Sequence, residues 1–267
     1  MLTWAVRMAA AALVILVWLL YSGHGRPTPV LGSWSTGAPF DGTVVVMTYN
    51  INHARGIDGR VDLERITAVI SNSGAQVVSL QEVDRLLPRS GMRDQVREIA
   101  RALDMDYVCA PNLGVGRVGY GNAILSSFPM TDWEVVRFSG IKERRGIARV
   151  ALDLGDGKTL QVFSTHLSFD PTEVGGQARQ AMRFIASFGA PKVVMGDLNL
   201  EDDAPEVGLA STRYQDAGHH AGFTFPSWAP RCRIDYILVS RSVTVLEARV
   251  IWSDASDHLP VMARLSL

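Results

Sequence analysis

The segment KVVMGDLN, residues 192–199, joins a short apolar run to two polar side chains, Asp197 and Asn199, at its end. The β-branched residues before Gly196 predict a strand that is buried on both faces. Acceptor groups at the end of such a strand must be solvated, paired with donors or bound to a metal ion. One example of this pattern carries little information, so its recurrence elsewhere in the chain decides what it means.

Five further strands carry polar side chains in the same kind of position. If these strands share one end of the fold, the side chains converge on a single site. They are Asn50 at the end of TVVVMTYN (43–50), Glu82 in QVVSLQEV (76–83), His166 in TLQVFSTHL (159–167), Asp235 just inside RIDYILVS (233–240), and Asp257 with His258 directly before LPVMARLSL (259–267).

The residue types at these positions suit one kind of chemistry. Several carboxylates with Asn oxygens and few cysteines favour a hard cation, Mg²⁺ or Mn²⁺, over zinc. A histidine beside a carboxylate can act as an acid–base pair, and a divalent ion with Asn donors can hold a phosphoryl oxygen. The sequence contains no P-loop, no GxSxG elbow and no HExxH motif, which argues against the enzyme classes that those motifs identify.

Between these segments, further β-rich runs alternate with amphipathic ones. Many strands and few helices predict two stacked sheets flanked by helices, rather than a simple doubly wound sheet. We expect helices at 61–74, 95–103 and 173–188, and additional strands at 122–127, 132–138, 147–154 and 243–252.

The composition fits one globular domain with a modest negative charge. The 267-residue chain is 47% hydrophobic, which is enough for a core of ordinary size. Residues 1–40 contain two of the 26 basic residues and none of the 27 acidic ones, so residues 41–267 carry a net charge of −3. A slightly acidic domain argues against tight, sequence-independent binding of nucleic acid, although a local basic groove would still allow a nuclease.

The N-terminus contains an uncharged apolar run, MAAAALVILVWLLY, at residues 8–21. Fourteen residues of helix rise about 21 Å, short of the roughly 30 Å hydrocarbon core of a bilayer, and residues 2–6 extend the run to a full span. We expect an uncleaved signal anchor over residues 1–21, with a cleaved signal peptide and a buried helix as alternatives. The flanking arginines favour a catalytic part outside the cytoplasm. Residues 22–42, rich in Gly, Pro and Ser, predict a linker to a domain over residues 43–267.

Two cysteines, Cys109 and Cys232, are too few for a disulfide framework. Two unpaired, half-buried thiols are the favoured interpretation. A single bridge is the alternative if the domain lies outside the cytoplasm.

Seven motifs, in their order along the chain, resemble those of the endonuclease/exonuclease/phosphatase superfamily, which includes deoxyribonuclease I, apurinic endonucleases, bacterial sphingomyelinases and inositol-polyphosphate 5-phosphatases. The resemblance covers residues 43–267, and GDLN followed by SDHLPV is its most specific part. It implies the deoxyribonuclease I-like fold, a four-layer α/β/β/α sandwich with the site at one end of the two sheets. The motifs are TYN (48–50), LQEVD (80–84), YGNAILS (120–126), THLS (165–168), GDLN (196–199), RIDYIL (233–238) and SDHLPV (256–261).

The resemblance also implies a reaction, in-line attack of a metal-organised water on phosphorus. Carried over position by position, Glu82 is the main metal ligand, with Asn50 beside it and Asp257 helping with the metal or orienting its neighbour. Asp197 orients or deprotonates the attacking water. Asn199 holds the phosphate.

The remaining motif residues receive supporting roles from the same resemblance. Asp235 orients His258 at the phosphoryl group, and His166 protonates or stabilises leaving oxygens. Tyr120 matches the tyrosine of the apurinic endonucleases, with a packing role as the alternative. Arg145 matches a phosphate-contacting arginine of bacterial hydrolases in this group, with a solvated surface cation as the alternative.

These observations predict an enzyme that cleaves a phosphodiester. The N-terminal helix and the acidic domain favour a lipid headgroup or another small phosphoester as substrate. An extracytoplasmic nuclease acting on DNA or RNA is the second hypothesis, and a binding protein that keeps the fold without catalysis is the third. The expected partners are the phosphoester substrate and a membrane, and no protein partner is predicted.

Overall fold

The computed structural model describes residues 29–35, 37–140, 144–189 and 191–267. The predicted signal anchor at residues 1–21 lies outside these ranges. Among the described residues, no helix combines the length and the apolar character needed to cross a membrane.

Seven strands form the first sheet, in the spatial order β1-β4-β5-β3-β2-β13-β12. Strands β2 and β3 run parallel, and all other neighbours in this sheet are antiparallel. The strands are β1 (Val30–Gly32), β2 (Thr43–Asn50), β3 (Val77–Arg85), β4 (Asp106–Val115), β5 (Val118–Ser126), β12 (Thr244–Val250) and β13 (Val261–Ser266).

Six strands form the second sheet, in the order β10-β11-β9-β8-β7-β6, with β8 and β9 parallel and the other neighbours antiparallel. Its pattern therefore repeats that of the first sheet, one parallel pair within an antiparallel frame. The strands are β6 (Met130–Arg137), β7 (Gly146–Asp153), β8 (Thr159–His166), β9 (Lys192–Asp197), β10 (Tyr214–Asp216) and β11 (Asp235–Ser240).

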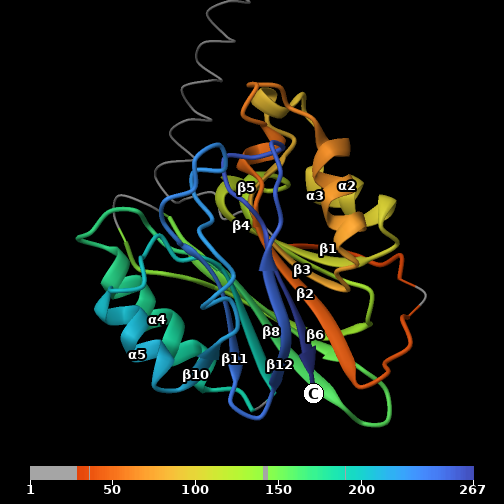
Figure 1. Ribbon diagram of the computed structural model, residues 1–267. Coiled ribbons are helices and arrows are strands. Elements are labelled where there is room, and N and C mark those ends of the chain that lie inside the picture. Colours follow the sequence, from red (N-terminus) through yellow and green to blue (C-terminus); the bar gives the residue numbers. More distant parts are fainter. Residues whose placement is uncertain (1–28, 36, 141–143, 190) are drawn as a thin grey trace, which may run out of the picture.

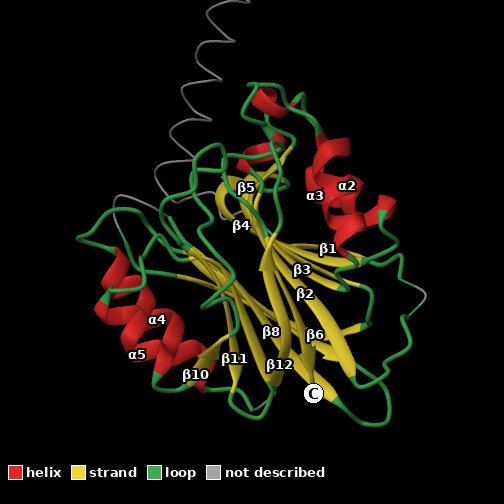
Figure 2. Cartoon of the chain, viewed as in Figure 1, coloured by secondary structure: helices red, strands yellow, loops and turns green. Residues whose placement is uncertain are grey.

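Two pairs of helices cover the outer faces of the sheets (Figures 1 and 2). Helices α2 (Leu63–Ser73) and α3 (Gln95–Ala102) lie on the first sheet, and α4 (Val174–Ala186) and α5 (Pro205–Ser211) lie on the second. Short 3-10 turns, η1 (Asn52–Ala54) and η2 (Pro88–Ser90), follow β2 and β3. Asp62 caps α2 by accepting bonds from the Glu64 and Arg65 amides, which fixes where that helix begins.

Three hydrophobic cores separate these layers. The central core joins the facing surfaces of the two sheets through residues such as Val46, Ile124, Val150 and Met195. The second packs α2 and α3 against the first sheet, and the third packs α4 and α5 against the second. The predicted four-layer α/β/β/α sandwich is confirmed.

The two parallel strand pairs bring the polar strand ends together. Asn50 of β2 pairs in register with Gln81 of β3. His166 of β8 pairs with Asp197 of β9, and Asp197 is also opposite Asp235 of β11. Gly196 allows β9 to lie close to β8, because a Cβ atom at this position would lie 1.9 Å from the Thr165 carbonyl oxygen. The glycine of GDLN therefore serves the approach of two site-bearing strands.

The structure differs from the sequence expectations at the N-terminal edge. Strand β1 lies within residues 22–42, the predicted linker, and pairs with β4, so the folded domain starts before Thr43. The pattern of apolar residues gave no expectation of β4, whose Pro111 falls at a β-bulge. Helix α5 was likewise not expected. Cys109 and Cys232 are free thiols, as favoured from their number.

Candidate active site

Asp197, at the end of β9, lies at the centre of the converging side chains. Its Oδ2 accepts a hydrogen bond from Asn50 Nδ2 at 3.0 Å and lies 3.3 Å from His166 Nε2. The Asn199 amide donates to its Oδ1 at 2.9 Å. Burial and the charge of Asp235 raise the pKa of Asp197. A carboxylate whose pKa moves toward neutrality is suited to take up a proton.

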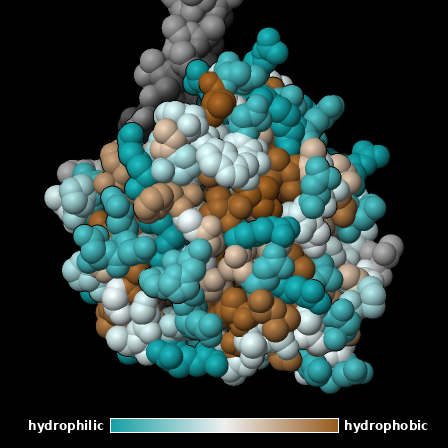
Figure 3. All heavy atoms as spheres, in the orientation of Figure 1, coloured by the Kyte–Doolittle hydropathy of each residue, from teal (hydrophilic) through white to brown (hydrophobic). Residues whose placement is uncertain are grey.

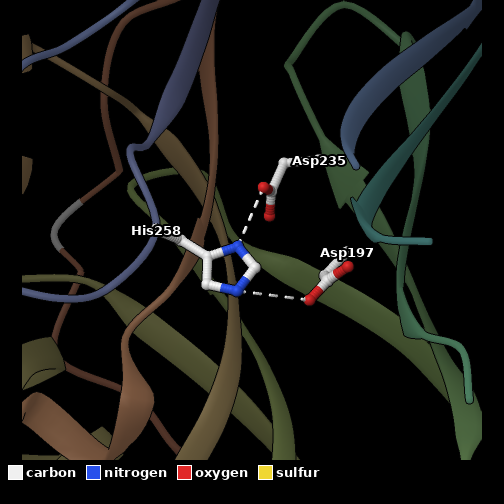
Figure 4. A group of neighbouring side chains, drawn as sticks. All are labelled: Asp197, Asp235 and His258. Atoms are coloured by element: carbon white, nitrogen blue, oxygen red, sulfur yellow. Dashed lines mark hydrogen bonds and ion pairs between the residues drawn. The ribbon is translucent and has the colours of Figure 1, made fainter. Parts of the chain in front are cut away.

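His258 forms an ion pair with Asp235, the first residue of β11 (Figure 4). The distance from Nδ1 to Asp235 Oδ2 is 3.0 Å, and Nε2 points toward Asp197 Oδ2 at 3.8 Å. Although burial disfavours its charge, Asp235 and Asp197 raise the pKa of His258 to about 10. His258 is therefore an imidazolium at neutral pH, and 3.8 Å is too long for a direct bond, so its Nε2–H can reach a substrate oxygen.

His166 has the opposite surroundings. Arg145 Nη1 lies 2.8 Å from His166 Nδ1, and both side chains are buried. A guanidinium can only donate hydrogen bonds, so Nδ1 must accept, and the single ring proton lies on Nε2. Burial, together with the charge of Arg145, holds the pKa of His166 well below its usual range. His166 is thus a neutral hydrogen-bond donor facing Asp197.

Asn199 follows β9 in a left-handed backbone conformation, with φ at 50°. Its Nδ2 donates to the Leu167 carbonyl at 2.9 Å and lies 3.1 Å from His166 Nε2. The side chain is half-buried. It therefore lies at the open edge of the group formed by Asp197 and His166.

Glu82 projects from a β-bulge in β3, where Gln81 and Glu82 lie opposite the single residue Asn122 of β5. Its backbone φ is 60°, a conformation that side-chain-bearing residues rarely adopt. Asn50 Nδ2 lies 3.2 Å from Glu82 Oε1, and the Tyr120 hydroxyl is hydrogen-bonded to the same carboxylate. Arg89 lies over the Tyr120 ring at 5.0 Å and is paired with the buried Asp84. The strained backbone directs Glu82 out of the sheet and into the site.

Asp257 brings a second carboxylate toward Glu82. Burial raises the pKa of Asp257, and the negative charge of Glu82 raises it further. The Ser256 hydroxyl donates to the Asn50 carbonyl at 2.7 Å, which fixes the loop that carries Asp257 beside the end of β2. The atoms with which Asn50, Glu82 and Asp257 could ligate a metal ion are all oxygens. Glu82 and Asp257 are both acidic, and they repel each other without a counter-charge. This set fits a hard divalent cation.

A second group with metal-binding residue types is Asp197, Asp235 and His258, whose ligand atoms lie within 4.8 Å of one another. Here the imidazolium of His258 already supplies a positive charge between the two carboxylates. The two groups therefore differ in charge, because the Asp197 group contains a histidine cation whereas Glu82 and Asp257 are both acidic.

The structure thus gathers the sequence-predicted residues Asn50, Glu82, Tyr120, Asp257 and His258 from the first sheet, its neighbouring strands and loops. Arg145, His166, Asp197, Asn199 and Asp235 come from the second sheet and its edges. Arg145 is bonded to His166, and its contact with substrate phosphate remains a prediction. His219 and His220 lie at a turn, with ring centroids 4.5 Å apart.

Several supporting residues were not singled out from the sequence. The Ser256 hydroxyl ties the loop before β13 to the end of β2, and Thr224 Oγ1 accepts from the Ile234 and Asp235 amides. The Phe225 ring packs against His258, with centroids 4.7 Å apart. Ser256 belongs to the SDHLPV motif and was a usable signal, whereas Thr224 and Phe225 are placed only by tertiary contacts.

Comparison with known proteins agrees with this geometry. The family model described as the endonuclease/exonuclease/phosphatase family matches residues 47–258. No curated protein matches the chain.

Solved structures share the fold. An endonuclease/exonuclease/phosphatase from Beutenbergia cavernae is 26% identical, with a TM-score of 0.71 over 84% of this chain and 72% of that chain. A mannosyl-6-phosphatase from Bacteroides thetaiotaomicron is 18% identical, with a TM-score of 0.72 over 84% and 100% of the two chains. Truncated TDP2 from Caenorhabditis elegans is 22% identical, with a TM-score of 0.65 over 84% and 98%.

Proposed function

This chain belongs to the endonuclease/exonuclease/phosphatase family, and from that premise we propose that it is a divalent-metal-dependent phosphodiester hydrolase. The family comprises phosphoester hydrolases, so hydrolysis of a phosphoester is established at that level. The single observation that carries the finer proposal is the position of Asp197. It lies within reach of Asn50 and of two histidines, one positively charged and one neutral.

Glu82, Asn50 and Asp257 would hold the cation, which we propose is Mg²⁺ or Mn²⁺. When bound, the ion supplies Lewis-acid stabilisation of the phosphoryl oxygens. The closeness of the Glu82 charge to Asp257 supports this assignment, because it favours a bound counter-charge, and strained backbone such as that at Glu82 is common at ligand sites.

Asp197 takes a proton from the attacking water while the water oxygen bonds to phosphorus and the bond from phosphorus to the leaving oxygen breaks. The raised pKa of Asp197 suits it to accept this proton. The leaving oxygen is protonated from solvent. His258 donates from Nε2 to a phosphoryl oxygen, with Asp235 holding the ring through Nδ1.

His166 and Asn199 orient Asp197 and the phosphate. The neutral ring of His166 can donate from Nε2 but has no proton to release, so we assign it a hydrogen-bonding role rather than the protonation of leaving oxygens. The half-buried amide of Asn199 is placed to contact a phosphate at the open edge.

We propose a lipid headgroup or another small phosphodiester as substrate, hydrolysed outside the cytoplasm by a domain that residues 1–21 anchor to a membrane. The net charge of −3 over residues 41–267 supports this choice over a nucleic acid. An extracytoplasmic nuclease remains the second candidate, since arginines such as Arg55 and Arg60 lie on the loop after β2.

The test is a substrate panel on the full chain in mild detergent, with Mg²⁺, Mn²⁺ or EDTA. The panel contains bis-p-nitrophenyl phosphate, sphingomyelin, phosphoinositides, plasmid DNA and RNA, with His258→Ala as the matched inactive control. We expect metal-dependent turnover of a soluble diester and of a lipid, both abolished by EDTA. Turnover that survives EDTA, or that His258→Ala retains in full, would contradict the mechanism. Turnover of nucleic acid alone would establish the second candidate.

A further inference from the structure

Large apolar side chains are exposed at the end of the molecule where the site opens. Eleven described residues of this kind are exposed, and several of them lie in loops that follow the site-bearing strands. We define the apolar rim as five of these residues. They are Ile57 (49% exposed), Met92 (56%), Phe169 (71%), Phe223 (55%) and Trp228 (60%).

Main-chain contacts tie the rim to the site. Phe169 lies three residues after His166, directly beyond the buried Ser168. Trp228 follows Ser227, whose amide donates to the Asp257 carbonyl at 2.7 Å and whose hydroxyl donates to the Ser256 carbonyl. The two aromatic residues therefore stand beside the two histidine-bearing segments of the site.

The other rim residues lie on neighbouring loops of the same end. The Ile57 amide donates to the Asp254 carbonyl, in the loop that leads to His258. Phe223 precedes Thr224, which accepts from the Asp235 amide. Met92 lies in the loop between β3 and α3, beyond the strand that carries Glu82. In Figure 3 brown and pale spheres gather in the upper centre, over the loops above β12.

The path of the chain leads to the same end. Strand β1 pairs antiparallel with β4, with Gly32 opposite Tyr107 and Val30 opposite Cys109. These partners pair with Leu125 and Ala123 of β5, which lie opposite Val78 and Leu80 of β3. Traced backward from Gly32 to Val30, β1 therefore runs in the same direction as β3 does from Val78 through Leu80 to Glu82. Pro29, the first residue that the structure describes, therefore enters β1 from the end of the first sheet at which the site opens.

The charges of this end favour a lipid surface over a nucleic acid. Three arginines near the rim are paired with acids, Arg65 with Asp58, Arg89 with Asp84 and Arg93 with Glu98. Salt bridges to acids reduce the net positive charge that these three arginines offer to a phosphate backbone. The rim also contains aliphatic side chains, which do not stack on bases but do enter the boundary between headgroups and acyl chains.

We propose that the apolar rim enters the surface of a phospholipid bilayer, so that the site takes a phosphoester from a lipid headgroup that remains in its membrane. This inference rests on the proposed function for its substrate, but the contact itself is independent of turnover. The rim holds the opening over Glu82, Asp257 and Asn199 against the headgroup layer, where the ester bonds lie.

The contact is tested by a fluorophore that reports an apolar environment, attached through Trp228→Cys in the full chain. Cys232→Ser removes the half-buried thiol, and Cys109 is 1% exposed and does not react in the folded protein. The matched control carries the same label through Leu246→Cys on β12, a side chain that is also exposed, at 51%. The protein is reconstituted into phosphatidylcholine vesicles that contain sphingomyelin and phosphoinositides.

We expect a blue shift and quenching by brominated lipid at position 228, and neither at position 246. Equal signals at the two positions, or no quenching at 228, would overturn the proposal. Preferential protection of the 228 label by single-stranded DNA, with no response to vesicles, would overturn it in favour of base stacking.

A rate comparison tests the consequence for catalysis. Replacing Phe169 and Trp228 by Ser removes two apolar contacts, so we expect kcat/KM on vesicle lipid to fall about ten-fold more than on bis-p-nitrophenyl phosphate. The control pair Leu246→Ser and Trp133→Ser should lower neither rate. Equal losses on both substrates would overturn the proposal. If the unaltered protein hydrolyses neither substrate, the proposed function fails while the fluorescence result still decides the contact.

Discussion

The two histidines of the site lie against the same carboxylate, yet one is positively charged and the other is neutral. His258, in the loop before β13, is held by Asp235, and His166, at the end of β8, is held by Arg145. Both rings are buried, so desolvation disfavours a charge on each. The neighbour at Nδ1 decides the outcome, an imidazolium in the first case and a neutral ring in the second.

This difference separates two tasks that one residue type could perform. A charged ring can neutralise a phosphoryl oxygen, and a neutral ring with its proton on Nε2 can hold Asp197 without competing for the water proton. The residue identity alone therefore does not give the role of a histidine. Its Nδ1 partner does.

The largest effect is expected at Asp197, the carboxylate that both histidines approach. Asp197→Asn keeps the shape but removes the proton acceptor, so we expect kcat on bis-p-nitrophenyl phosphate to fall about 10³-fold. Circular dichroism and the thermal midpoint serve as controls for folding. A variant that keeps more than a tenth of the activity would show that neither histidine acts through Asp197.

The charge of His258 is tested by Asp235→Asn. Asp235 helps to raise the pKa of His258 to about 10, and the protonated form is the active one, so activity is lost as pH rises through that pKa. Without the carboxylate this loss moves to lower pH, and we expect about 10²-fold lower kcat at pH 8. The measurement is the pH profile of kcat from pH 6 to 10. An unchanged alkaline limb would contradict the ion-pair assignment.

The neutrality of His166 is tested by Arg145→Met, with Arg145→Lys as the charge-conserving partner. Burial and Arg145 lower the pKa of His166, so removing the arginine lets the ring take up a proton as pH falls. We expect about a ten-fold loss of kcat that deepens toward pH 6 in the Met variant. Nitrogen-15 spectra of the ring should show the Nε2–H tautomer in the unaltered protein, and an Nδ1–H tautomer there would refute the assignment.

The smallest effect is expected away from both histidines, at Tyr120. Its hydroxyl bonds to Glu82, which Asn50 and the backbone also hold in place. A hydrogen bond to a charged group contributes about 1.5–3 kcal/mol, and because Asn50 also holds Glu82 we expect the lower end of this range, so Tyr120→Phe should weaken the apparent metal affinity roughly ten-fold. A metal titration of the rate measures this. A loss as large as that of Asp197→Asn would give Tyr120 a direct part in the reaction.

The sequence was sufficient for the layers and for most of the site. Asn50, Glu82, Asp197 and Asp235 could be found because each interrupts or ends an apolar strand, and the ends of buried strands meet in space.

What the sequence did not contain was the pairing of strands. Arg145 meets His166 because β7 and β8 are antiparallel with Gly146 opposite His166, and that register follows from packing of the central core. Strand β1 was missed for a related reason. Three residues in a Gly- and Pro-rich segment show no periodicity. They are ordered by the edge of β4, by the stacking of Trp34 on Tyr107 and by the bonds from the Trp34 and Ser35 amides to Asp106.

The order of strands in the first sheet has a consequence for the synthesis and folding of the protein. Strand β13, the last in the chain, lies between β12 and β2, and His258 directly precedes it. Asn50, synthesised some two hundred residues before Ser256, therefore gains the bond from the Ser256 hydroxyl only after the segment that leads into β13 has been made. A nascent or truncated chain cannot assemble both halves of the site. The site is therefore complete only after residues 256–258 have been synthesised and β13 has joined the sheet, which is a late, non-local step of folding.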